Sequence, residues 1–138
     1  MSSPPDLPKF VVWAPDYTDE GVLQRRQALR PSHREKALKL ISQGILRVAG
    51  GCTTLESIHA TAEDKKFVGS CLIFEGENID VVRKLVEEDM FYKGDVVCVL
   101  AAMMDIDTVT LTGSVQWDKE KLVILPIALA TSLPPVPS

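Results

Sequence analysis

The sequence lacks the features that mark secreted, membrane-spanning and nucleic-acid-binding proteins. Its three cysteines have no CxxC spacing and no signal peptide precedes them, which predicts reduced thiols in the cytoplasm. The longest apolar runs, residues 96–104 and 122–130, have nine residues each, about half of the roughly 18 that a membrane-spanning helix needs. A net charge of −4 and a pI near 5.1 argue against nucleic acid or an anionic membrane as partners. We therefore expect a cytoplasmic protein that binds neither.

The motifs that hold nucleotides, metals or a nucleophilic serine are also missing. The sequence contains no GxGxxG or GxxxxGK[ST] phosphate loop and no GxSxG turn. Cys52 and His59 lie seven residues apart without a second nearby pair of ligands, so a metal site is not favoured. Ser70 has no histidine or acid that the sequence places beside it, and Cys71 lies in an apolar run typical of a core. We therefore expect no cofactor and no metal.

The composition is that of one globular domain. Of the 138 residues, 46% are hydrophobic and 25% are charged, which is enough to bury a core without disulfides or metals. We expect residues 1–8, which are rich in proline and serine, to be a disordered leader. We expect residues 9–127 to form the domain and residues 128–138 to form a tail.

Apolar patterns predict four strands and two helical regions. The strands are expected at residues 9–14, 45–49, 67–75 and 122–127. The helices are expected at residues 21–29, 31–43 and 79–88, with Asn78 as the N-cap of the last. We expect the first helix to stop at Arg30 and restart at Pro31, because a proline disfavours the α conformation of the preceding residue. The glycines at 50 and 51 are expected to end the second strand, and residues 52–66 to form a surface loop.

This order, β-α-β-β-α-β, predicts an α+β fold of the ferredoxin-like sandwich type, with two helices on one face of an antiparallel sheet. Pro126 interrupts the last strand and requires an edge position for it. The other face of the sheet needs a cover, because the bulky residues of segments 10–13 and 67–74 supply more apolar surface than two helices can bury. We therefore expect a homodimer.

His33 and Asp89 are the candidate chemical groups. If the helix restarts at Pro31, His33 lies in its first turn, where unpaired N–H groups favour a neutral imidazole, the form that a general base needs. We expect the two helices to run parallel, so that Asp89 reaches His33, fixes its tautomer and raises its basicity. The alternative is a solvated histidine, since charged residues 34–36 follow it. As an acid at the end of a helix, Asp89 has no obvious structural role.

A set of separated motifs resembles the YCII-related (YciI-like) family. These motifs are Asp16, Arg26, Arg30-Pro31-Ser32-His33, Gly50-Gly51, Gly69-Ser70, and Asp89 before Phe91-Tyr92. The resemblance covers residues 9–95 and resumes at residues 117–127. Many members have a proline after the aspartate, where this chain has Met90.

The resemblance implies a dimeric α+β barrel whose cleft holds a His33–Asp89 dyad, with Arg26, Arg30 and Tyr92 beside it. Relatives include a dehydrochlorinase that acts on a hydroxyquinone without a cofactor. We therefore expect a small cofactor-independent enzyme, a lyase or isomerase, acting on an aromatic or quinone-like metabolite. The alternative is a non-catalytic dimeric module that binds a small molecule in the same cleft. Monooxygenase chemistry with heme or a metal lacks a ligand set.

Residues 97–116 interrupt the family pattern. Their removal joins Gly94-Asp95-Val96 to Trp117, as the resemblance leads one to expect. The segment begins with valine, whose codons start with GT, and ends with glutamine, which CAG can encode. We therefore expect a short intron that is read through in frame, or an inserted loop whose apolar residues pair as a hairpin.

Overall fold

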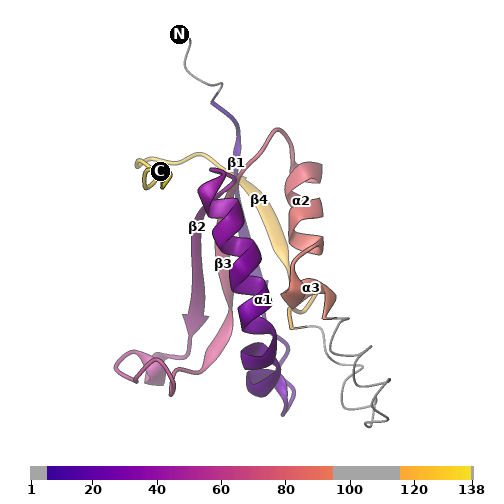
Figure 1. Ribbon diagram of the computed structural model, residues 1–138, viewed down its shortest axis with the longest axis vertical. Helices are drawn as coiled ribbons and strands as arrows, with labels where there is room; N and C mark the ends of the chain where they lie inside the picture. The colour runs from indigo at the N-terminus through magenta and orange to yellow at the C-terminus, as the bar shows by residue number, and fades with distance from the viewer. Residues whose placement is uncertain (1–5, 95–115, 138) are drawn as a thin grey trace.

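The computed structural model describes residues 6–94 and 116–137. Its elements in chain order are β1 (Lys9–Pro15), α1 (Val22–Ser42), β2 (Leu46–Thr53), the short 3₁₀ helix η1 (Leu55–Ser57), β3 (Phe67–Glu75), α2 (Ile79–Glu87), α3 (Met90–Lys93) and β4 (Val123–Ile127) (Figure 1). The four strands form one sheet in the order β2-β3-β1-β4, and every neighbouring pair is antiparallel. The predicted α+β sandwich is confirmed. β4 lies at the edge, where Pro126 costs no ladder hydrogen bond on its open side.

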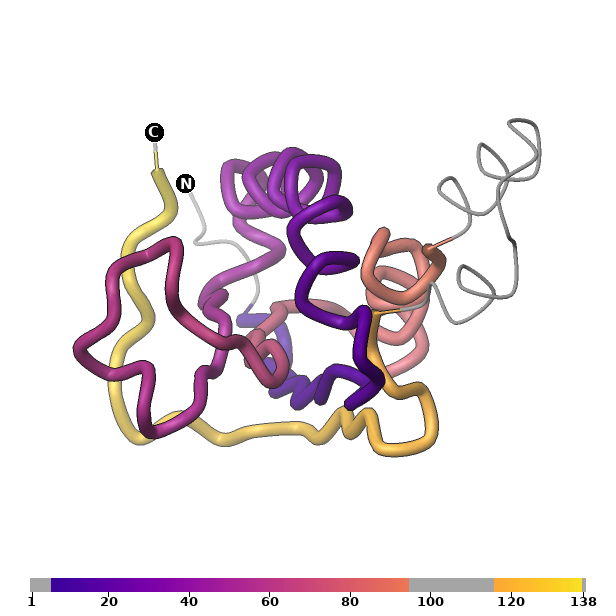
Figure 2. The backbone as a smooth tube through the Cα atoms, turned by 90° about the horizontal axis from the view of Figure 1, so that it is seen from below, coloured from indigo at the N-terminus to yellow at the C-terminus, as the bar shows by residue number. Residues whose placement is uncertain are grey.

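The helices lie together on one face of the sheet, as Figure 2 shows. Along β1 the side chains of Phe10, Val12 and Ala14 are buried on this face, while Trp13 is exposed on the opposite face. Helix α2 contributes Val82 and Val86, which are almost inaccessible to solvent. The Asn78 side chain accepts a hydrogen bond from Val81 N–H, so the predicted N-cap of α2 is confirmed. The core therefore lies between the helices and one face of the sheet.

The predicted break at Arg30 and Pro31 is wrong, because α1 is one continuous helix with Pro31 inside it. An internal proline costs about 3 kcal/mol. Leu29 before it and Ala37 after it are both buried in the same core, and this shared packing keeps the two halves on one axis. Because α1 is continuous, His33 lies in its middle and not beside unpaired N–H groups. The N-terminal electrostatic argument for a neutral imidazole therefore fails.

The expectation of parallel helices is also wrong. Strands β1 and β3 are antiparallel, so the helices that follow them run in opposite directions. Figure 1 shows α1 rising from its indigo end while α2 descends toward α3. The end of α2 and the start of α3 thereby reach the middle of α1, which is where His33 lies.

The second strand extends further than predicted. β2 continues through Gly50 and Gly51 to Thr53, because the missing side chain of Gly51 leaves space for the ring of Phe67. A Cβ added at Gly51 would lie 2.6 Å from Cδ1 of Phe67, whereas one added at Gly50 would meet no atom within 4 Å. Gly51 thus serves side-chain packing, and neither glycine ends the strand.

The segment predicted as an insertion lies outside the described residues, except for Gln116. The chain before and after the segment lies side by side, because the N–H of Trp117 donates to the carbonyl oxygen of Phe91 at 2.9 Å, as does the N–H of Gln116 at the end of the segment. Residues 1–5 of the predicted leader are likewise outside the described part. In the predicted tail, the carbonyl of Pro134 accepts a hydrogen bond from Arg47 Nη2 at 3.0 Å. Among the described helices, none has the length and apolar character needed to cross a membrane.

Candidate active site

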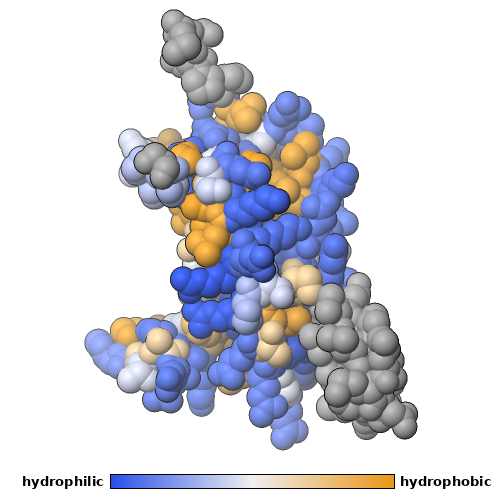
Figure 3. Space-filling model, viewed as in Figure 1, coloured by the Kyte–Doolittle hydropathy of each residue, from blue (hydrophilic) through white to orange (hydrophobic). Residues whose placement is uncertain are grey.

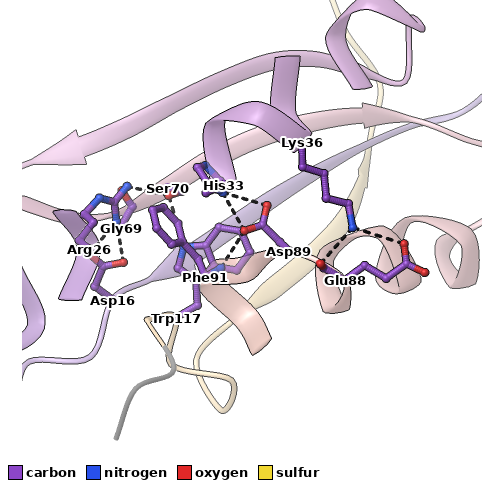
Figure 4. A network of polar contacts seen from close by, with 10 residues as sticks. All are labelled: Asp16, Arg26, His33, Lys36, Gly69, Ser70, Glu88, Asp89, Phe91 and Trp117. Carbon is purple, nitrogen blue, oxygen red and sulfur yellow. Dashed lines mark hydrogen bonds and ion pairs between the residues drawn. The ribbon is translucent and has the colours of Figure 1, made fainter. Parts of the chain in front are cut away.

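The imidazole of His33 and the carboxylate of Asp89 form a direct pair. His33 Nδ1 lies 2.7 Å from Oδ1 and 2.9 Å from Oδ2 of Asp89 (Figure 4). A carboxylate is an acceptor, so Nδ1 carries the hydrogen and Nε2 carries the lone pair of the neutral ring. Both side chains are largely buried, which shields the pair from solvent.

Asp89 is at the same time the N-cap of α3. Its Oδ1 accepts a hydrogen bond from the N–H of Phe91 at 2.9 Å, and its own N–H donates to the carbonyl of Val86 at the end of α2. Asp89 is therefore held by its side chain to α3 and by its backbone to α2. This corrects the sequence-based view that Asp89 has no obvious structural role.

A second link fixes the same turn to α1. Nζ of Lys36, one turn beyond His33, donates to the carbonyl oxygen of Glu88 at 3.0 Å and lies 3.5 Å from its carboxylate (Figure 4). This contact is partly exposed, so its electrostatic contribution to stability is modest. Its geometric effect is to keep the residue before Asp89 against α1.

Two aromatic rings hold the imidazole plane. The ring of Phe91 stacks on His33 with a centroid distance of 3.9 Å and an interplanar angle of 12°. Trp117 contacts both rings edge-on, with centroid distances of 5.9 Å to His33 and 5.7 Å to Phe91. Because Phe91 and Trp117 are fully buried, the imidazole has little freedom to rotate.

Arg26 forms a buried network next to this stack. Its Nη1 donates to both carboxylate oxygens of Asp16, at 2.8 and 2.7 Å, and its Nη2 donates to Ser70 Oγ at 3.0 Å. The guanidinium carbon lies 4.8 Å from the ring centroid of Phe91 and 5.0 Å from that of Phe67. In Figure 4 the Phe91 ring lies between the guanidinium of Arg26 and the imidazole of His33. The charge of Arg26 is therefore compensated by Asp16 before any ligand binds.

A cleft of about 1200 Å³ opens between α1 and β2, beside this network. Figure 3 shows hydrophobic side chains in the gap between these elements, while the outer surface of α1 is hydrophilic. Of the predicted site residues, His33, Arg26 and Arg30 line the cleft, and Ser70 and Phe91 join them from β3 and α3.

The other two predicted residues lie outside the cleft lining in the described part of the chain. Asp89 lies behind His33 and contacts its Nδ1 at 2.7 Å. The ring of Tyr92 packs under the amino group of Lys119, with Nζ 4.3 Å from the ring centroid. The geometry thus brings His33, Asp89 and the two arginines together and leaves Tyr92 apart.

The rim of the cleft carries more positive than negative charge. Arg30, Arg34, Lys65 and Lys66 line it, against only Glu63 and Asp64. In the resolved ranges, neither Arg30 nor Arg34 has an ion-pair partner. This excess favours an anionic ligand.

Two pKa shifts lie near the site. Both Nη atoms of Arg25 donate to the carboxylate of Asp19, each at 2.8 Å. This guanidinium lowers the pKa of Asp19, which lies just before α1. Burial raises the pKa of the Cys52 thiol at the end of β2, and the neighbouring Cys71 adds to the effect. Among the described residues, Cys52 and Cys71 form no disulfide. Within residues 6–94 and 116–137 no three His, Cys, Asp or Glu side chains gather as metal ligands would.

The sequence did not assign a role to Asp16, Ser70, Phe91 or Trp117, which complete the site. Three of them, Asp16, Ser70 and Phe91, occur in the motifs that carry the family resemblance, and this was the available signal. Their contacts join positions far apart in the chain, such as Arg26 and Ser70, so spacing alone could not reveal them.

The fold and the site define an α+β sandwich protein with a histidine–aspartate pair at the wall of an open cleft. Residues 9–104 match the model of the YCII-related domain, and the chain belongs to that family. A solved structure of similar fold is the 5-chloro-2-hydroxyhydroquinone dehydrochlorinase of Burkholderia phenoliruptrix AC1100 in complex with 2,5-dihydroxybenzoquinone. The TM-score is 0.57 at 20% identity, over 85% of this chain and 90% of that chain, so the likeness is one of fold. No curated protein matches the sequence significantly.

Proposed function

We propose that this chain is a cofactor-independent lyase or isomerase that acts on an aromatic or quinone-like metabolite. The observation that carries the proposal is the His33–Asp89 pair, which leaves one ring nitrogen of a cleft-lining histidine free to act as a base. Support also comes from the solved relative, whose name states a dehydrochlorination of a hydroquinone and whose structure holds a quinone.

The chemistry requires a base that can return the proton. Nε2 of His33 removes a proton from a ring hydroxyl, the O–H bonding pair forms a C=O bond, and the imidazolium delivers the proton to a ring carbon. Loss of a second hydroxyl proton then expels a leaving group from that carbon with its bonding pair. The ring thus loses one proton and one anion in total, and no oxidant is needed. An isomerisation uses only the first transfer.

Asp89 stabilises the imidazolium that forms during each transfer and keeps the hydrogen of the neutral ring on Nδ1. The stacked ring of Phe91 adds a favourable face for the cation. Arg30, which has no ion pair among the described residues, is suited to attract a phenolate or carboxylate. Arg26 contributes less directly, since Asp16 already binds it.

We also propose a homodimer formed through the uncovered face of the sheet. This face exposes large apolar side chains: Trp13 at 38%, Val48 at 36%, Val123 at 41% and Leu125 at 54%. Light scattering at micromolar concentration should give twice the chain mass, and Trp13→Glu should give a folded monomer. A wild-type monomer with an intact far-ultraviolet circular dichroism spectrum would contradict the dimer.

The enzymatic proposal is tested with 5-chloro-2-hydroxyhydroquinone and a panel of other hydroxylated aromatics, by chloride release and absorbance. His33→Ala should lower the rate about 10²–10⁴-fold, the usual contribution of a general base. His59→Ala is the matched control, since His59 is the other histidine and is exposed on the loop after η1. Ligand binding without turnover, unchanged in His33→Ala, would instead show a non-catalytic binding module.

A further inference from the structure

We propose that the hydroxyl group of Ser70 is the hydrogen-bond donor that binds a negatively charged oxygen atom of the ligand. The inference rests on the proposed function, and it adds a residue and a ligand group to it. Ser70 is 2% exposed, yet it lines the cleft from β3. The direction of a buried O–H bond is set by the hydrogen bonds that its oxygen accepts, and the Ser70 oxygen accepts two.

The oxygen of Ser70 already accepts two hydrogen bonds. Arg26 Nη2 donates to it at 3.0 Å, and the indole Nε1 of Trp117 donates at 3.3 Å. A hydroxyl has two lone pairs and one hydrogen, so both acceptor positions are occupied. The hydrogen has no acceptor among the residues that the structure describes. Ser70 can therefore only donate to what enters the cleft.

Arg26 is less suited to this role than Ser70, because both of its Nη groups are already engaged. Nη1 is occupied by Asp16, and Nη2 lies 3.0 Å from Ser70 and 3.4 Å from the carbonyl oxygen of Gly69. The ring centroids of Phe67 and Phe91 both lie within about 5 Å of the guanidinium carbon. The positive charge instead polarises the Ser70 hydroxyl, because donors in a chain of hydrogen bonds strengthen one another. A hydroxyl polarised in this way favours a charged or strongly polar acceptor.

The ligand chemistry follows from this polarity. Ser70 is linked through Arg26 to the same Phe91 ring on which His33 stacks, so donor and base belong to one cleft wall. A ring that carries an ionised hydroxyl or a quinone oxygen offers an acceptor for Ser70 and a second oxygen for His33. The inferred ligand class is therefore a hydroxyquinone or polyhydroxybenzene in its anionic form.

The test compares Ser70→Ala and Ser70→Cys with the wild-type protein. Trp117 fluorescence reports binding in a Trp13→Phe background, which leaves Trp117 as the single tryptophan. The probes are 2,5-dihydroxybenzoquinone and 1,4-dimethylbenzene, a ring of similar size without oxygen. Ser70→Ala should weaken binding of the quinone about 10- to 100-fold, as expected for a hydrogen bond to a charged group. Ser70→Cys, with its weaker S–H donor, should fall in between, and binding of 1,4-dimethylbenzene should not change.

Each other result has a distinct meaning. Equal losses for both probes would show that Ser70 only supports the packing of the cleft, and the proposal would fall. Unchanged quinone affinity in Ser70→Ala would also overturn it, while leaving the role of His33 intact. If the wild-type protein binds no probe and turns over none of the aromatic panel, the proposed function falls as well.

Discussion

Replacing Asp89 by asparagine and by alanine separates its two roles. Asparagine keeps an oxygen that can accept from the N–H of Phe91 and so remains a good N-cap. It also places an NH₂ group where Oδ2 accepts from His33 Nδ1, at 2.9 Å, and leaves Oδ1, 2.7 Å from Nδ1 and already bound by the N–H of Phe91, as the one remaining acceptor. The NH₂ group would face Nδ1–H at the Oδ2 position, and we expect this donor–donor contact to move the imidazole hydrogen to Nε2. The Asp89→Asn variant should therefore fold well, while His33 loses the unprotonated Nε2 that acts as the base.

Alanine removes both functions. Loss of the cap costs about 1 kcal/mol, and loss of a hydrogen bond to a charged group costs about 1.5 kcal/mol. For a chain of this length, 1 kcal/mol corresponds to roughly 3 °C in Tm, so Asp89→Ala should melt about 7–9 °C below wild type. Asp89→Asn should lose no more than about 3 °C. Thermal unfolding followed by circular dichroism measures both.

The tautomer can be read without a substrate. Nitrogen-15 spectra of the imidazole groups distinguish a protonated from an unprotonated ring nitrogen, and the chain has only two histidines. His33 should show hydrogen on Nδ1 in wild type and on Nε2 in Asp89→Asn, while the exposed His59 should show the same averaged signal in both. Any activity should fall about 10²–10⁴-fold in Asp89→Asn. An unchanged His33 spectrum in Asp89→Asn, or an Asp89→Ala variant as stable as wild type, would refute this account of the dyad.

Further predictions follow from packing, titration and chain connection. Gly51→Ala should lower the free energy of unfolding by about 1–3 kcal/mol, because the new methyl group overlaps the ring of Phe67. Gly50→Ala should have little effect on it. Equal free energies of unfolding in urea for the two variants would contradict this. Because the pKa of Cys52 is raised, the folded state holds the thiol proton more tightly, and this group's contribution to stability should fall as pH rises past about 8.5. Peptide mapping should then show slower alkylation of Cys52 by iodoacetamide at pH 8 in the native protein than in urea, and equal rates would be evidence against burial. Deletion of residues 97–116 should give a soluble protein at least as heat-resistant as the full chain, since the described flanks already lie side by side; failure to fold, or a gene without GT and AG at these boundaries, would end the read-through hypothesis.

Sequence alone determined the elements whose signals are local. The strand predicted at residues 67–75 coincides with β3, and the Asn78 cap begins α2 as expected. These predictions succeeded because β-branched composition and capping act over a few residues. The order of elements then left few ways to arrange an antiparallel sheet, so the fold class followed, and Pro126 identified the edge strand.

Tertiary structure decided what no local signal contains. Pro31 remains inside α1 because Leu29 and Ala37 pack into one core, and this cooperative burial outweighs the preference of a single proline. Likewise, Gly51 continues a strand because a ring from the next strand occupies the space of its missing side chain. Composition marks both residues as breakers, yet their neighbours in space determine the outcome.

The site depends on tertiary structure most of all. His33 and Asp89 are 56 positions apart, and Arg26 and Ser70 are 44 apart. The family motifs in the sequence predicted that His33 and Asp89 form a pair. The reason first given for their contact, two parallel helices, was wrong. Antiparallel packing brings the turn between α2 and α3 to the middle of α1, and the cap that this turn requires also orients the imidazole. Hydrogen bonds and ring contacts at 3–5 Å fix such a site, and only the folded chain defines those distances.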